Sequence, residues 1–286
     1  MTRRKNMVRF PGNWLRERET LLHHTAATVF ICVFAMSLHA SEDESQLAQR
    51  GRHLVELGYT RVDGFDGDIF LLEPAYTYSY SRNLRISIAT QLASLEVPAA
   101  DEPGGAEDVN ETGQGDSSLI IQYDPGANLT SNPWVPDTIG LFGSVLMPTG
   151  DTDRGLSGDT WSASIGAGWP IILSETFLAA PTIIYSSTFA HGDDAVPLEE
   201  LGVGVSLLWL SPVGAWIGIE PFISWDFENS EAIDALSLIV GKSFRNGLGF
   251  DLQWGNRRRA ENFAKRDDEF LIFKVHWQFG APPRNL

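Results

Sequence analysis

The chain has 286 residues, with 37 Asp and Glu against 21 Lys and Arg, which gives a formal net charge of −16. So acidic a chain is poorly suited to nucleic acid, whose phosphates demand clustered cations. It contains one cysteine, Cys32, which excludes an internal disulfide and a metal site built from several cysteines.

Residues 1–40 have the parts of an export signal peptide. A positively charged start is followed by an apolar run over 25–38, and Ala40 supplies a small residue before an acidic segment. We expect cleavage after about Ala40, with Met7 as an alternative start of translation. A membrane anchor is the other interpretation, although the apolar run is shorter than the roughly twenty residues that span a bilayer.

Cleavage would remove Cys32 and make the chain more acidic. The leader holds six of the 21 Lys and Arg and two of the 37 Asp and Glu, which leaves 15 against 35 and a net charge near −20. Beyond the leader no apolar run is long enough for a spanning helix, so a membrane-spanning mature chain would have to be a β-barrel.

After a polar tail over 41–51, the chain alternates between apolar and small or polar residues, which is the periodicity of β-strands. In the first of these segments, a helix over 47–57 is the alternative interpretation. Twelve strands are predicted, over 53–62, 69–80, 84–95, 117–123, 139–147, 161–169, 177–189, 200–210, 213–227, 232–244, 248–256 and 271–279. A C-terminal tail over 280–286 follows them.

Aromatic residues gather near the ends of the predicted strands, on their apolar faces. They are Trp161, Trp169, Tyr185, Trp209, Trp225, Trp254 and Trp277. Aromatic girdles of this kind mark the two interfaces of an outer-membrane barrel. The sequence therefore favours an all-β fold, a single transmembrane antiparallel barrel of about twelve strands over 52–279, in a bacterial outer membrane. A soluble β-sandwich with aromatic residues at the ends of its core is the alternative.

The connections between the strands separate into two groups. With twelve strands, short turns at 82–83, 174–175, 211–212 and 245–247 lie on the rim that carries both chain ends, which is the periplasmic rim in such barrels. The acidic or charged loops over 97–115, 191–199 and 257–268 lie on the opposite rim. The connection over 124–136 is the exception, because it is long and yet lies on the periplasmic side.

Charged and polar side chains occupy the strand positions that would face the barrel interior. The candidates for lining the lumen are Glu56, Glu73, Arg85, Gln91, Glu220, Asp226, Asp251, Lys274 and His276. They would either line a polar path and select solutes by charge, or pair with one another and fill a closed lumen. The residues alone leave both interpretations open.

Three segments resemble a known family. They are Gly58-Tyr59 in the first strand, the run GQGD over 113–116, and LMPTGD over 146–151, which contains Pro148, Thr149, Gly150 and Asp151 and precedes a glycine-rich strand. In this setting the chain resembles, over 52–279, the outer-membrane proteins of the meta-pathway of phenol degradation. The resemblance implies an outer-membrane channel for small hydrophobic or aromatic compounds, without catalytic residues. Its expected partners are outer-membrane lipid and lipopolysaccharide, the outer-membrane assembly machinery and a small-molecule solute.

Other chemistry is weakly supported. The acids of the loop over 151–159 do not follow the spacing of a calcium-binding loop, so we predict no metal and no cofactor. The mature chain has three histidines and no G-x-S-x-G segment, so we predict no enzyme activity. One basic cluster, placed by the prediction on an outer loop, would face lipopolysaccharide phosphates or simply be solvated: Arg257, Arg258, Arg259, Lys265 and Arg266.

Overall fold

The structure is a computed structural model that describes residues 53–64, 67–81, 83–97, 109–124, 139–154, 156–157, 160–191, 199–227, 231–244, 246–261 and 264–280. The predicted leader, the predicted tail over 41–51 and all of the predicted tail over 280–286 except Gly280 lie outside these ranges. The region described is built almost wholly of strands, with one short 3-10 helix, η1 (Thr152–Arg154). Within it, no helix has the length and apolar character needed to cross a membrane.

Twelve long strands form one antiparallel sheet whose neighbours in space are neighbours in sequence. A two-residue strand, β7 (Ile171–Ile172), adds to β8 at one rim. The long strands are β1 (His53–Gly64), β2 (Gly67–Ser79), β3 (Leu84–Val97), β4 (Val109–Tyr123), β5 (Gly140–Met147), β6 (Thr160–Gly168), β8 (Phe177–His191), β9 (Glu199–Leu210), β10 (Ala215–Asp226), β11 (Glu231–Ser243), β12 (Leu248–Glu261) and β13 (Ala264–Phe279).

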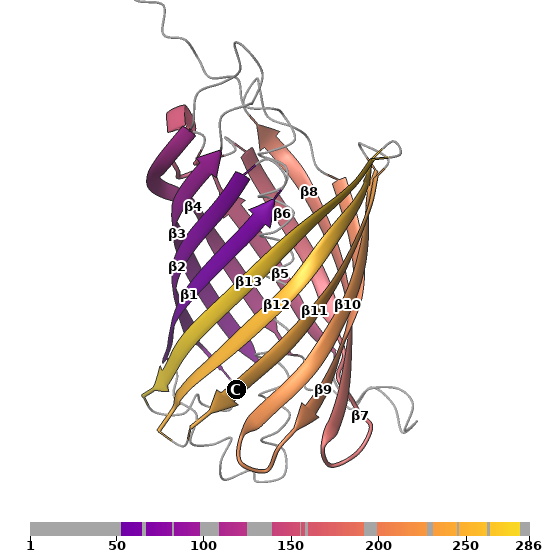
Figure 1. The fold of residues 1–286 in the computed structure, drawn as a ribbon. Coiled ribbons are helices and arrows are strands. Elements are labelled where there is room, and N and C mark those ends of the chain that lie inside the picture. The colour runs from indigo at the N-terminus through magenta and orange to yellow at the C-terminus, as the bar shows by residue number, and fades with distance from the viewer. Residues whose placement is uncertain are drawn as a thin grey trace, which may run out of the picture.

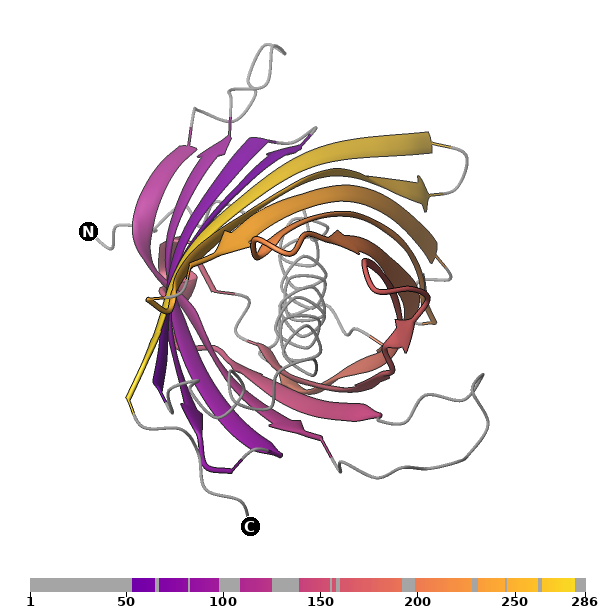
Figure 2. The same cartoon turned by 90° about the horizontal axis from the view of Figure 1, so that it is seen from below.

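The sheet closes on itself. The first and last strands pair from His53 opposite Phe279 to Asp63 opposite Glu269, and β6 pairs with β8 on the far side. Figure 1 shows the tilted strands from the side, and Figure 2 shows them as a ring seen along its axis. Closure leaves no free sheet edge, which a strand-built protein needs in lipid because unpaired backbone groups there cost several kcal/mol each. The prediction of a twelve-stranded barrel is confirmed, and the helix over 47–57 is wrong from His53 onward.

Apolar side chains cover the outside of the barrel. In β10, for example, Ile217, Ile219 and Ile223 are exposed, while Glu220 and Ser224, which have the opposite parity, are buried. Other strands repeat this order, so large apolar side chains face outward around the ring. A soluble sandwich hides its apolar face, whereas this one presents it to the surroundings. The fold is therefore a transmembrane barrel of the outer-membrane type.

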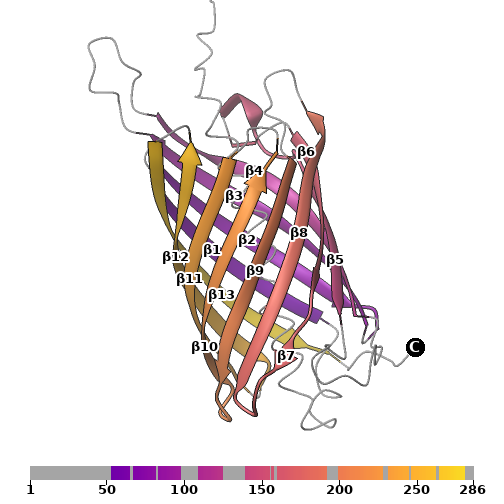
Figure 3. The same cartoon turned by 90° about the vertical axis from the view of Figure 1, so that its right-hand side faces the viewer.

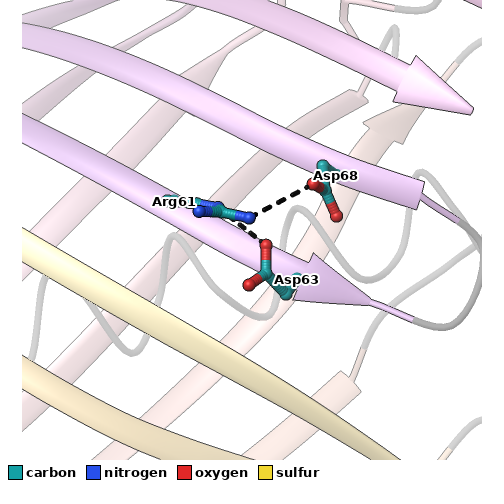
Figure 4. Close-up of polar contacts among 3 residues, drawn as sticks. All are labelled: Arg61, Asp63 and Asp68. Atoms are coloured by element: carbon teal, nitrogen blue, oxygen red, sulfur yellow. Dashed lines mark hydrogen bonds and ion pairs between the residues drawn. The ribbon is translucent and has the colours of Figure 1, made fainter.

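The apolar outer surface ends at a charged group on β1 and β2. Arg61 donates from Nε to Asp63 at 2.8 Å and from Nη2 to Asp68 at 3.5 Å, as Figure 4 shows. The three side chains are between about one-third and one-half exposed, and the Arg61 guanidinium also lies over the Phe70 ring. Charged side chains beyond the last apolar ones are expected where the hydrocarbon layer gives way to lipid headgroups.

An aromatic group lies at the other end of the same strands. The His53 ring stacks on Phe279 with centroids 5.3 Å apart and bonds through Nδ1 to the Tyr76 hydroxyl at 2.7 Å. Trp277 stacks on Phe279 as well. Aromatic rings at this depth form part of an interfacial girdle. Among the predicted girdle residues, Tyr185 and Trp254 instead lie well inside their strands.

The connections divide between the rims as the sequence predicts. The β2–β3, β9–β10 and β11–β12 turns lie on the rim where β1 begins and β13 ends, at the bottom of Figure 1, and β4 ends and β5 begins at the same rim. Gly247, in the β11–β12 turn, has φ of 83°, and a Cβ there would meet the Gln278 backbone. Gly247 is thus needed for both the turn geometry and the close approach of β13.

Two predicted loops are wrong. Residues 109–115 are not loop but the first half of β4, and they pair with β3 up to Val97 opposite Val109. The loop over 257–268 is instead the ends of β12 and β13, which pair as far as Glu261 opposite Ala264. Both segments lie toward the outer rim, where either face of a strand can be polar because it meets water rather than lipid. Figure 3 shows β12 reaching the top of the barrel.

Candidate functional site

The nine residues predicted to face the lumen alternate with exposed apolar residues in their strands. Gln91, Glu220, Asp226, Asp251, Lys274 and His276 are buried, and Glu56, Glu73 and Arg85 are partly buried. They come from β1, β2, β3, β10, β12 and β13, so most of them lie along one contiguous side of the barrel.

Glu220 on β10 lies at the centre of a hydrogen-bonded group. One carboxylate oxygen accepts from the Ser206 hydroxyl on β9, and the other accepts from Gln253 Nε2 on β12 at 3.2 Å. Gln253 also donates to the Ser237 hydroxyl on β11 at 2.8 Å. Four adjacent strands are thus tied together across the interior. Because a buried carboxylate needs compensating donors, Ser206 and Gln253 are what make Glu220 tolerable there.

Two contacts between a basic and an acidic side chain continue this group toward β1. The Lys274 ammonium lies 3.8 Å from Glu56, and His276 Nδ1 lies 3.8 Å from the Asp251 carboxylate. In the strand register Asp251 faces Lys274 and Glu56 faces His276. Lys274 and His276 therefore each have the carboxylates of Glu56 and Asp251 nearby.

A third contact brings in β2 and β3, where Gln91 Nε2 donates to the Glu73 carboxylate at 3.0 Å. We call the whole set the polar belt: Gln91, Glu73, Glu56, Lys274, His276, Asp251, Gln253, Glu220 and Ser206. It holds four carboxylates against one lysine and one histidine, so its net charge is negative. Serine hydroxyls such as Ser206 were missed by the sequence analysis as site residues, although the alternation in β9 gives Ser206 inward parity.

The wall from β5 to β9 is different. Phe142, Leu178, Ala180, Ile184 and Leu208 are buried there as one apolar cluster, with Leu210 and Phe222 packed against it. Its polar groups are mostly hydroxyls, such as the bonded pair Ser164 and Ser186 at 2.8 Å. The interior therefore presents a charged side and an apolar side to each other.

The PTGD segment after β5 is fastened to β4. Thr149 Oγ1 and Ser117 Oγ are hydrogen-bonded at 2.8 Å, the Gly150 amide donates to Asp116 Oδ1 at 3.2 Å, and the Asp151 amide donates to the Gln114 carbonyl at 3.1 Å. These contacts give Thr149, Gly150 and Asp151 a structural role in holding the loop, which begins at Pro148 directly after β5. The run GQGD belongs to the same contact surface.

Neither a metal site nor a catalytic pair is found among the described residues. Asp151 pairs with Arg154 at 3.2 Å, and no group of three or more His, Cys, Asp or Glu is arranged to hold a metal in this part of the chain. His53 bonds to the Tyr76 hydroxyl, and His276 Nδ1 lies near the Asp251 carboxylate. The side chain of His191 lies outside the description.

The predicted basic cluster is not on a loop. Arg257 lies in β12, 2% exposed, and its Nη2 donates to Asp268 of β13 at 3.0 Å. Arg257 and Asp268 are directly opposite in the register, so opposite charges hold this part of the hairpin together. The placement of the cluster on an outer loop is therefore wrong, and Arg257 at least is turned away from lipopolysaccharide.

One titratable group at the periplasmic rim has a shifted pKa. Asp124 follows β4, and its backbone exchanges hydrogen bonds with Asn83 in the β2–β3 turn, at 2.8 and 2.6 Å. Burial raises the pKa of Asp124 to about 6, and the positive charge of Arg85 limits the rise. Arg85 therefore lies beside an acid at the rim rather than in the polar belt.

No protein-family model matches the chain, and no curated protein matches it. Solved structures do. The crystal structure of an outer membrane channel from Pseudomonas putida F1 has 14% sequence identity and a TM-score of 0.58, over 80% of this chain and 96% of that chain. The NanC porin has 5% identity and a TM-score of 0.51, over 79% and 100%. The chain has the fold of an outer-membrane barrel.

A more distant match is the CymD monoaromatic hydrocarbon channel, with 10% identity and a TM-score of 0.46, over 87% of this chain and 94% of that chain. At such identities two chains are shown to share a fold and nothing more. The barrel fold of this chain and its apolar outer surface are those of a protein of the bacterial outer membrane. The resemblance to the meta-pathway family stays a prediction.

Proposed function

We propose that this barrel is a channel for passive passage of small solutes across the outer membrane, and that the solutes are small hydrophobic or aromatic compounds. The observation that carries the proposal is the two-sided interior. A charged polar belt faces a wall that includes Phe142, Leu208 and Phe222. A path with both kinds of surface suits a molecule with an apolar body and a polar group, since each part meets a matching wall.

The nine predicted residues are assigned as lining this path. In the proposal, Glu220 and Glu56 attract cations or hydrogen-bond donors, and Lys274 moderates the negative potential. Charge near a constriction acts across a medium of low dielectric and so controls which ions pass. Arg85 acts at the periplasmic exit. No cofactor takes part.

The substrate class rests on the sequence resemblance, and its test is uptake. Cells lacking the gene should take up a radiolabelled aromatic acid or phenol more slowly than cells complemented with the intact gene. Complementation with Lys274→Gln should restore part of the uptake. Equal uptake in the deleted and complemented strains would refute the proposal that the solutes are aromatic compounds, even if the barrel conducts ions.

A second candidate is a non-conducting barrel with a structural or surface-binding role. The observation that favours it is the pairing of Lys274 with Glu56 and of His276 with Asp251, because side chains that satisfy one another can close a lumen. Under this alternative, neutralising Lys274 changes stability but produces no current change, since there is no current.

In either case the expected partners are outer-membrane lipid on the apolar surface, lipopolysaccharide near Arg61, and the assembly machinery that inserts such barrels. When the assembly machinery is depleted, the protein should fail to reach the folded form that shows a heat-modifiable gel shift.

A further inference from the structure

The interior near the outer mouth contains an apolar patch that the polar belt does not explain. Four strands contribute inward-facing apolar side chains to it, and these are Val62, Ile69, Leu71, Ala93 and Leu95, with Phe270 packed against them. The patch adjoins the belt, because Glu73 follows Leu71 on β2 by two residues and Gln91 precedes Ala93 on β3 by two. Apolar side chains facing a wet channel mouth are costly unless something covers them.

Leu156 covers this patch. It belongs to the loop between β5 and β6, and its side chain is 1% exposed among the apolar residues of β1, β2 and β3. Gly113 of β4 leaves room for it, since a Cβ at Gly113 would lie 2.8 Å from Leu156 Cδ1. A leucine from a surface loop therefore fills a recess in the barrel wall.

The loop that carries Leu156 is held by polar contacts at the outer rim, where Figure 1 shows η1 beside the top of β4. The Leu156 amide donates to the Asp151 carbonyl at 2.9 Å, and Arg154 donates to the Thr112 carbonyl at 3.1 Å. Arg154 also pairs with Asp151, and its side chain is 53% exposed. Exposed polar contacts of this kind contribute little each, so the loop can be displaced more easily than a strand.

We propose that this patch is a binding site for a small apolar or aromatic solute at the outer mouth, and that Leu156 occupies the site until a solute displaces it. The proposal rests on the proposed function and adds the place where the solute first binds. A site that accepts a leucine side chain accepts an apolar group of similar size. Release from it leads to the polar belt, which gives the polar group of the solute its next contacts.

Phenol is a suitable probe, because it dissolves in water and has an apolar ring of about this size. The protein, reconstituted in lipid nanodiscs and labelled at leucine and valine methyl groups, is titrated with phenol and followed by NMR. We expect saturable shifts of the Leu71 and Leu95 methyl signals. Outward-facing Leu238 serves as the internal control, because it reports only phenol dissolved in the lipid.

Two variants test the role of Leu156. Leu156→Ala removes the side chain that competes for the site and should tighten phenol binding at least threefold. Gly150→Ala should do the same without touching the patch, because its Cβ would lie 2.8 Å from the Gly115 backbone and the loop must lift. Gly143→Ala is the matched control, since its Cβ would meet only Ser164 O, at an ordinary 3.8 Å, and should leave binding unchanged.

Leu95→Ser makes the patch polar and should weaken phenol binding at least threefold. Each variant is first checked for the heat-modifiable gel shift of a folded barrel. Shifts at Leu95 that stay linear and match those at Leu238 would overturn the site. An unchanged affinity in both Leu156→Ala and Gly150→Ala would overturn the role of Leu156.

Conductance measured on the same samples separates this inference from the proposed function. A conducting barrel without saturable shifts overturns the site alone. Saturable shifts in a barrel that carries no current overturn the channel alone.

Discussion

Asp268→Asn tests the buried ion pair that joins β12 to β13. Arg257 and Asp268 are 3.0 Å apart, and their side chains are only 3% and 5% exposed. Removing one partner of a buried pair leaves the other charge uncompensated, which costs about 3–5 kcal/mol. We therefore expect Asp268→Asn to lower the free energy of unfolding by about that amount.

Asp63→Asn is the matched control, because it makes the same change to an acid paired with arginine. The Arg61–Asp63 pair is as short, at 2.8 Å, but its side chains are 45% and 47% exposed. Exposed pairs contribute about 0–1 kcal/mol because water screens them. Urea unfolding in phospholipid vesicles, followed by tryptophan fluorescence, measures both variants.

The comparison has a clear refutation. If Asp268→Asn and Asp63→Asn cost the same small amount, then 257–268 behaves as the solvated loop of the sequence prediction and the long hairpin is wrong. The double variant Arg257→Met with Asp268→Leu adds a second check. Replacing both charges by apolar groups should recover most of the loss, because no uncompensated charge remains.

Four further predictions follow from the barrel and its interior. Glu220→Gln should lower the cation-to-anion permeability ratio in planar bilayers by about tenfold, because one charge acting over about 6 Å of water changes the entry of cations and of anions by about threefold each, in opposite directions. Lys274→Gln should raise the ratio, and ratios unchanged in both variants would remove the polar belt from the conduction path. Leu238→Arg puts a charge on the lipid face near the middle of β11 and should cost about 2–4 kcal/mol in vesicle unfolding, whereas a cost near zero would place that face in water. Asp124, whose pKa is raised to about 6, binds its proton more tightly in the folded barrel than in the unfolded chain, so the unfolding free energy should fall by about 2 kcal/mol as pH rises from 4 to 6; Asp124→Asn should lose this pH dependence, and an equal dependence in both proteins would contradict the assignment. N-terminal sequencing of the mature protein should begin near Ser41, and a start well before it would refute the cleavage site.

The alternation of apolar and polar residues was enough to predict the barrel and the segregation of its turns, because lipid on one side and polar interior on the other impose period two. The pattern failed where the strands leave the membrane. In β4, Asn110, Thr112 and Gln114 are exposed and polar on the face that would be apolar within the bilayer. No sequence periodicity marks such a segment, whose pairing depends on backbone hydrogen bonds with β3.

The sequence predicted which side chains face the barrel interior, but not which side chains they contact there. Parity assigned Glu220 to the interior, yet its contact with Gln253 crosses from β10 to β12 and depends on strand tilt and register. Leu156 was harder still. Nothing in a polar loop indicates that a single leucine returns to the barrel wall, because the contact depends on where β1 to β3 lie in space.

Single-channel recording of the purified, heat-modifiable protein in planar bilayers tests the central claim most directly. A channel predicts discrete, reproducible conductance steps, with cations preferred over anions because the polar belt carries four carboxylates against one lysine. A correctly folded barrel that inserts into the bilayer and carries no current would contradict the account.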